Sequence, residues 1–412
     1  MDYFYKQKLR NIEPKRVKLE ELRNLTRQFD LDMEIKDVFS LDRFGVLSEE
    51  IQVDGSSTLL EAFNYVDNEK MDLVDSLKDI EFCGFDDKNN IILKFKTIDD
   101  LQVCGVYNFT YEFLDDLFSL GGFYSFSEEK HTFDILSNAI IELFKKFPEE
   151  KRQYRFLKYN NDWVLRGVTS TLYRNYDNHL VLYLSLLALH SYAKKTGNRF
   201  VVSGGQVSDS DISIFFEDPS PVHVEGVGDV YFGVFVSNGE IRQKRFTFEV
   251  TYRIDNGETS FGAMPELEEP LVKVTHKLKV ESVKRKIDNI FELDQYKKEM
   301  LTYIESLRDI QKLSPDAIHY LFNKIIRSKQ KFSDGTKNRV KELKNDKDII
   351  NNTLTLIEFL GRINEITTDI NERIHLQRIY DNVIRIITKA DWFSLFLFWI
   401  ILVGLKIKID NF

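Results

Sequence analysis

Basic side chains are the residues of this sequence whose types and spacing best suit a binding function. Lysine and arginine recur from residue 273 to residue 347, although the chain as a whole has a formal net charge of −9. Phosphate groups are bound by clusters of such cations on one face, which release counterions when the ligand binds. A basic block within an acidic protein therefore indicates either a polyanion partner or contact with the acidic half of the chain itself.

The candidate nucleic-acid-binding residues fall into a hairpin group and a helical group. They are Arg242, Lys244, Arg245 and Arg253 in a predicted hairpin, and Lys277, Lys279, Lys284, Arg285, Lys286, Lys324, Arg327 and Lys331 in the basic helices of residues 273–347. Exposed aromatic rings of the hairpin could stack on the bases of a single strand. The alternative is an ordinary solvated helix face, with Phe246, Phe248 and Tyr252 in the core.

Motifs for catalysis, metal binding and cofactors are absent from the sequence. No pair among the seven histidines has HExxH or HxH spacing, and neither cysteine lies near one, so we expect no zinc site. The patterns GxGxxG, GxxxxGK[ST] and GxSxG do not occur. Asp209 with Asp211, and Glu266 with Glu268 and Glu269, could bind a divalent ion, but solvated acidic loops are the simpler interpretation. The sequence thus predicts no catalytic residue, no metal and no cofactor, and an enzyme is unsupported.

The elements that must position the basic residues are densest between residues 154 and 253. Strands are predicted at residues 154–159, 163–168, 199–203, 211–217, 230–237 and 245–253, because apolar and polar residues alternate there between turn signals. A helix over residues 178–195 is apolar nearly all round, so it should be buried. Asn238-Gly239 predicts a two-residue turn between the last two strands. One face of that hairpin packs, and the other presents Arg245, Thr247, Glu249, Thr251 and Arg253 to solvent or a ligand.

The resulting fold class is α+β, with a central, mostly antiparallel sheet packed on a buried helix and a helical C-terminal region. We expect four regions: an acidic mixed α/β region (1–150), a strand-rich core (151–270), a basic helical region (271–390) and an apolar tail (391–412). Within the first region, helices are predicted at 17–28 and 71–78. Strands are predicted there at 80–85, 91–96 and 101–107.

The apolar tail from Trp392 to Leu405 is shorter than the roughly 20 residues that span a membrane. We therefore expect it to cover the core, and a membrane-associating tail is the alternative. The N-terminal residues contain no apolar leader segment, and two cysteines are too few for a disulfide scaffold. These features predict a cytoplasmic protein.

Two motifs of the central segment are similar to those of a known family. The first is an Arg–Ala–x–x–Ser–x–x–Tyr–Arg–x–x–Asp–Asn pattern, with glycine in the alanine place. It is matched by Arg166, Gly167, Ser170, Tyr173, Arg174, Asp177 and Asn178. The second is a Gly–x–x–x–Ser–Asn–Ser–Glu pattern, with glycine in place of the second serine. It is matched by Gly233, Ser237, Asn238, Gly239 and Glu240. A third pattern of the family, Arg–x–x–Cys–x–Asn–Gly, would end at Asn256-Gly257. The chain departs from it, with Thr251 in the arginine place and Ile254 in the cysteine place. The chain thus resembles, from about residue 110 to the 380s, a family of phage- and plasmid-encoded proteins with no established reaction.

The resemblance implies a mobile-element context and a mixed α/β fold. The simpler interpretation of its first motif is structural, with Asp177 or Asn178 capping the buried helix. The first functional hypothesis is a non-enzymatic protein that binds DNA or RNA through the basic helices. The alternative is a protein-interaction or defence-related factor that binds an acidic partner or a second copy of itself, with membrane association less favoured.

Overall fold

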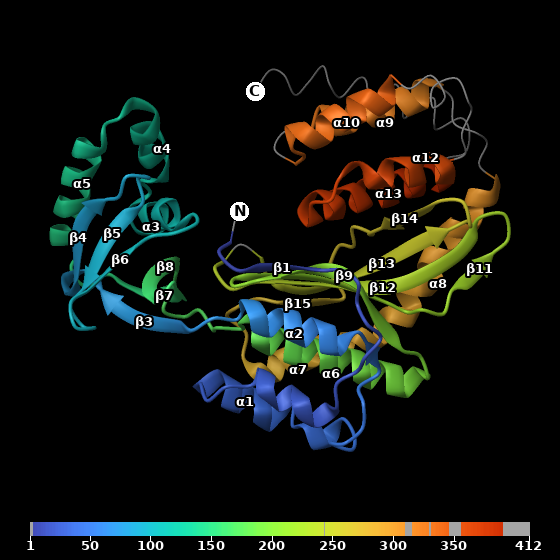
Figure 1. The fold of residues 1–412 in the computed structure, drawn as a ribbon, viewed down its shortest axis with the longest axis horizontal. Coiled ribbons are helices and arrows are strands. Elements are labelled where there is room, and N and C mark those ends of the chain that lie inside the picture. Colours follow the sequence, from blue (N-terminus) through green and yellow to red (C-terminus); the bar gives the residue numbers. More distant parts are fainter. Residues whose placement is uncertain (1–2, 243, 310–314, 329–330, 346–355, 390–412) are drawn as a thin grey trace.

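Helix α6 (Asn178–Thr196) lies between the sheet and helix α1 (Asp30–Val38) in the larger of two lobes (Figure 1). The structure, a computed structural model, describes residues 3–242, 244–309, 315–328, 331–345 and 356–389. Fifteen of the nineteen residues of α6 are buried, as its unbroken apolar composition predicts. Gly197 ends the helix in the left-handed conformation, with φ of 76°.

A nine-stranded, almost entirely antiparallel sheet packs on α6. Its strands are β1 (Lys6–Leu9), β2 (Val53–Asp54), β9 (Phe200–Ser208), β10 (Asp211–Glu217), β11 (Val222–Val224), β12 (Gly228–Gly239), β13 (Phe246–Asp255), β14 (Ser260–Ala263) and β15 (Val272–Val274). The main order is β1-β9-β10-β12-β13-β14, and β11, β15 and β2 pair with β12, β13 and β9. Only the β2–β9 pairing is parallel among the strand pairs of this sheet in the described residues. The expected α+β class is therefore confirmed.

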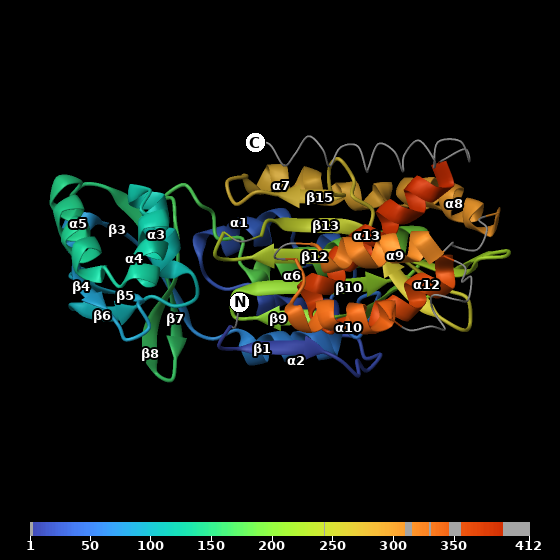
Figure 2. The same ribbon diagram turned by 90° about the horizontal axis from the view of Figure 1, so that it is seen from above.

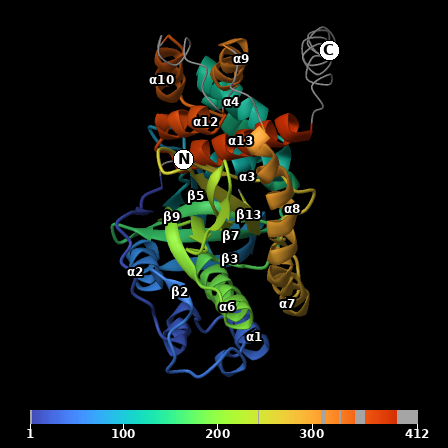
Figure 3. The same ribbon diagram turned by 90° about the vertical axis from the view of Figure 1, so that its right-hand side faces the viewer.

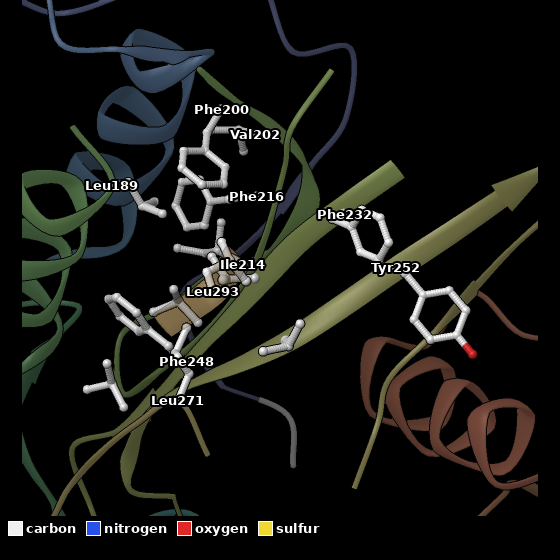
Figure 4. Packing of buried hydrophobic residues seen from close by; sticks show 14 of the residues in the cluster. Leu189, Phe200, Val202, Ile214, Phe216, Phe232, Phe248, Tyr252, Leu271 and Leu293 are labelled. Atoms are coloured by element: carbon white, nitrogen blue, oxygen red, sulfur yellow. The ribbon is translucent and has the colours of Figure 1, made fainter. Parts of the chain in front are cut away.

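Alternation along β13 separates a packed face from a polar face. Phe246, Phe248, Val250 and Tyr252 are buried in the large core, which also contains Ile214 and Phe232 of neighbouring strands (Figure 4). The residues that alternate with them point to the opposite side of the sheet, and they are Thr247, Glu249, Thr251 and Arg253. The core interpretation of these aromatic residues is thus confirmed.

Helices cover the sheet on both faces (Figures 1 and 3). On the α6 side lie α1 (Asp30–Val38), α2 (Ser56–Val66) and α7 (Val280–Ile287), together with the short 3₁₀ segment Leu19–Leu25. On the other side lie α12 (Leu356–Ile363) and α13 (Ile370–Lys389), and beyond them α9 (Pro315–Ile326) and α10 (Asp334–Lys344). Helix α8 (Leu293–Glu305) runs along the edge between the two sides.

The smaller lobe has a separate hydrophobic core (Figures 1 and 2). It contains two three-stranded sheets, β3-β7-β8 and β4-β5-β6, and helices α3 (Phe109–Phe118), α4 (Gly121–Lys130) and α5 (Phe133–Lys146). The strands are β3 (Lys70–Ser76), β4 (Ile80–Phe85), β5 (Ile91–Phe95), β6 (Leu101–Cys104), β7 (Lys151–Tyr159) and β8 (Asp162–Thr169). The expected boundary after residue 150 therefore falls inside this lobe, between α5 and β7.

Three local predictions were wrong. The segment predicted as a helix at 71–78 is strand β3, because it pairs with β7 from Lys70 to Ser76. The segment predicted as a helix at 17–28 forms a 3₁₀ helix only at Leu19–Leu25. Asn238-Gly239 is not a hairpin turn, since β12 continues through it and pairs with Asp211 and Ile212 of β10.

Among the residues described, no helix is long and apolar enough to cross a membrane. The apolar tail from Trp392 to Leu405 lies outside the described residues.

Candidate functional site

The site with the clearest chemical character lies where α13 crosses the polar face of β12 and β13. A small separate core holds the helix on the sheet there, and it consists of Phe215, Phe235, Met264, Ile370 and Ile374. Because α13 covers only part of this face, a pocket of about 540 Å³ remains beside it.

This basic pocket brings together cations from four separate parts of the chain. It is lined by Lys244, Arg245, Lys273, Lys331 and Arg378, and also by Phe235, Ser237, Thr247, Glu249, Pro270, Asn371, Ile374 and His375. Glu249 is its single carboxylate within the described part of the chain. The pocket therefore combines a buried apolar floor, from Phe235 and Ile374, with a strongly cationic rim.

Two of the five cations are neutralised by the protein itself. Lys244 Nζ lies 2.9 Å from Asp211 Oδ2, and Arg378 Nη2 donates to Glu249 Oε2 at 2.7 Å. Arg245, Lys273 and Lys331 have no ion-pair partner among the described residues, and Arg245 and Lys331 are exposed. The pocket thus has a local excess of positive charge that an anionic ligand could neutralise.

Of the predicted hairpin residues, Lys244 and Arg245 line the pocket and two others lie elsewhere. Arg242 Nη1 pairs with Asp116 Oδ1 of the small lobe at 2.7 Å. Arg253 pairs with Glu217 at 2.9 Å and with Asp255 at 3.1 Å, and its guanidinium lies 3.9 Å from the Tyr231 ring centroid. Both arginines therefore have structural partners.

The predicted helical residues are divided between the two sides of the sheet. Five of them belong to α7 and the turn before it, on the α6 side of the sheet (Figure 1): Lys277, Lys279, Lys284, Arg285 and Lys286. Lys324 and Arg327 belong to α9 and the residue after it, on the other side, and Lys331 lies at the pocket. The basic block thus does not form one surface, and only Lys331 of its eight predicted residues reaches the pocket.

Sequence reasoning missed Arg378 and Asn371 and left Lys273 out of the site. Asn371, Ile374, His375 and Arg378 line the pocket at the i, i+3, i+4 and i+7 spacing of one helix face. This spacing in the sequence could have identified these four residues as one helix face. The sequence could not show which face of the sheet α13 covers, because that depends on contacts between residues distant in the sequence.

A second polar cluster, fully buried, joins the two lobes. Arg166 of the small lobe pairs with Glu240 of the large lobe, and both side chains are inaccessible to solvent. Lys70 Nζ lies 2.9 Å from Glu240 Oε1, which also accepts a hydrogen bond from the Asn178 backbone at 3.0 Å. Arg155 Nη2 donates to Asp177 Oδ2 at 2.6 Å. The two motifs of the resemblance therefore meet at one ion-pair network.

Burial and charge act in opposite directions within this network. Burial disfavours ionised Glu240, but Lys70, Arg166 and Arg155 outweigh it and hold the pKa of this carboxyl well below its usual range. Burial dominates at Asp177 and raises its pKa despite the adjacent Arg155. Burial also lowers the pKa of His276, stacked 4.5 Å from the Tyr173 ring, to about 4. The charged groups of the network are paired with one another, so the network fits a structural role.

Beside this network, a polar cleft of about 420 Å³ separates α1 from the small lobe. Its charged groups are largely paired internally, as in Arg174 with Glu34 at 2.5 Å and His179 with Asp32 at 3.1 Å. No group of histidine, cysteine or acidic side chains within the described ranges is arranged to hold a metal ion. Unpaired cations of the described residues therefore gather in two places, the basic pocket and the stretch from Lys277 to Lys286, and only the first of these is a hollow.

Comparison of the chain with protein-family models, with curated proteins and with solved structures finds no match.

Proposed function

We propose that this protein binds nucleic acid, without catalysing a reaction on it, at the basic pocket between β12, β13 and α13. The observation that supports this most directly is the meeting of Arg245, Lys273 and Lys331 at one pocket, unpaired by any described residue. Three cations that line one pocket without ion-pair partners give it a positive potential, and phosphate groups would neutralise that charge.

The charge of the rest of the molecule restricts where such binding can occur. The chain has a net charge of −9, so its overall field repels a polyanion and only a local basic site can attract one. Lys244 and Arg378 add two further donors at the rim, already held in place by their carboxylate partners. Placing this binding in a mobile element rests on the motif resemblance alone.

Salt dependence of binding tests the proposal. The variant R245S/K273S/K331S should bind a fluorescein-labelled oligo(dT) more weakly than the wild type in fluorescence anisotropy. The slope of log K against log salt should become shallower by about 2, because each lost phosphate contact on a single strand contributes roughly 0.7.

A matched control removes three exposed charges from the small lobe. Lys130, Lys145 and Lys146 are exposed on α4 and α5, away from the basic pocket. K130S/K145S/K146S should keep the wild-type slope. Equal loss in both variants would show that net charge alone governs binding and would contradict a site at the pocket.

The same unpaired cations would also suit an acidic protein surface. That alternative is favoured if the wild-type protein binds no DNA or RNA at low salt yet retains partners from a nuclease-treated lysate, and loses them in R245S/K273S/K331S.

A further inference from the structure

The basic pocket is one end of a longer groove. A hollow of about 320 Å³ shares Glu249, Pro270 and Arg378 with it. A third hollow, of about 360 Å³, shares Pro265 and Leu267 with the second. The three hollows thus adjoin one another through shared residues, and we call them together the α13 groove.

One face of α13 forms the wall of this groove along nearly its whole length. Asn371, Ile374, His375 and Arg378 line the basic end, and Arg385 and Thr388 line the far end. From Asn371 to Thr388 the helix advances about 25 Å, at 1.5 Å per residue. That length corresponds to the shortest single-strand sites, of about four nucleotides.

The two ends of the groove differ in chemistry. The far end is lined by Val250, Pro265, Leu267, Tyr296, Met300 and Tyr303, among others. Tyr303 is fixed because its hydroxyl donates to Asp381 at 2.9 Å, and Arg385 lies 5.2 Å from its ring centroid. The Tyr296 ring is only partly buried against the core. A partly exposed aromatic ring therefore lies at the end opposite Arg245, Lys273 and Lys331.

The middle of the groove is unfavourable for phosphate. Glu266 is exposed there, and Glu249 is paired with Arg378. A ligand that fits must therefore place its phosphates at the basic end and an apolar, stackable group at the far end. Nucleic acid offers both only as a single strand, since a duplex keeps its base faces stacked inside.

We propose that the α13 groove binds one single strand of DNA or RNA, with phosphates at the basic pocket and a base stacked on Tyr296. This inference rests on the proposed function and adds the form of the nucleic acid and the residue that contacts its base. Tyr296 is a partly exposed surface residue, so its truncation should leave the fold intact.

The experiment compares full-length wild type with Y296A on four probes at low salt: oligo(dT), oligo(rU), a self-complementary DNA duplex and inorganic polyphosphate. Y296A should bind both single strands about tenfold more weakly, since base stacking contributes roughly 1–3 kcal/mol per base. Its affinity for polyphosphate should not change. Y65A is the control for loss of a surface tyrosine, because Tyr65 is an exposed tyrosine on α2, away from the groove.

The outcomes separate the two proposals. Equal affinity for duplex and single strand, or unchanged single-strand binding by Y296A, overturns the single-strand inference and leaves polyanion binding at the pocket standing. Failure of every probe, polyphosphate included, overturns both. Displacement of a bound strand by phosphatidylglycerol vesicles would instead assign the groove to an amphiphile with an anionic head and overturns the single-strand inference.

Discussion

At the scale of single residues, Glu240 has the most demanding environment. It is completely buried and contacts Arg166, Lys70 and the Asn178 backbone. A buried ion pair is weak evidence of net stabilisation, but removing one partner leaves the other charges without compensation. The side chain is therefore a sensitive probe of how the lobes are joined.

Replacement of Glu240 by glutamine should lower the free energy of unfolding by about 3–5 kcal/mol, because Arg166 and Lys70 remain buried. Urea unfolding measures this. The matched change Glu142→Gln removes an exposed pair with Lys145 and should cost less than about 1 kcal/mol. Similar losses in the two variants would contradict the buried network.

The same variant has a pH signature. The folded-state pKa of Glu240 is depressed, so its contribution is fully present above the unfolded value of about 4.3 and is lost as pH falls towards the folded one. The stability difference between wild type and E240Q should therefore narrow below about pH 4.3.

At the scale of elements, strong local patterns predicted the structure and long-range pairing overrode weak ones. The buried helix, now α6, follows from its uniform apolar composition. Strand β3 was predicted as a helix because its pairing partner, β7, lies about eighty residues away in the sequence. The basic pocket depends on the same kind of contact, since Lys273 joins Arg245 when β15 pairs with β13. Lys331 joins them when the residues that follow it pack on α13. Their residue types suggested phosphate binding, but their meeting could not be predicted from spacing.

Two glycines with open surroundings isolate the backbone contribution to element stability. A side-chain carbon at Gly197 or Gly122 would contact nothing within 4 Å, but Gly197 has φ of +76° and Gly122 lies within α4. G197A should lower stability by about 1 kcal/mol, whereas G122A should raise it by about 0.5 kcal/mol. Opposite shifts of the urea midpoints confirm this, and shifts of the same sign contradict it.

At the scale of the whole molecule, the sheet separates two groups of basic residues. Helix α7 lies on the α6 side of the sheet, and α13, which lines the basic pocket, lies on the other side (Figure 3). A ligand in the pocket therefore has no direct path to Lys279, Lys284 and Arg285. The dense run of basic residues in the sequence does not predict the binding surface, because the fold places the first part of the run on one side of the sheet and the second part on the other.

This separation predicts that K279S/K284S/R285S keeps the wild-type salt slope for oligo(dT), while R245S/K273S/K331S makes it shallower. Both variants lose three positive charges, so the comparison isolates position. A larger change in the α7 variant would move the site to the other side of the sheet and contradict the pocket.

The small lobe interrupts the large core between Val66 and Tyr176, which both belong to that core. The large core can form only when the chain between Val66 and Tyr176 is closed into a loop. The entropic cost of closing a loop grows with the length of its flexible chain. A lobe that folds first on its own core replaces that flexible chain with a rigid body whose two ends meet beside Glu240. We expect the lobe to form early and the sheet around α6 to form late, so the order of folding would run from the middle of the chain outward.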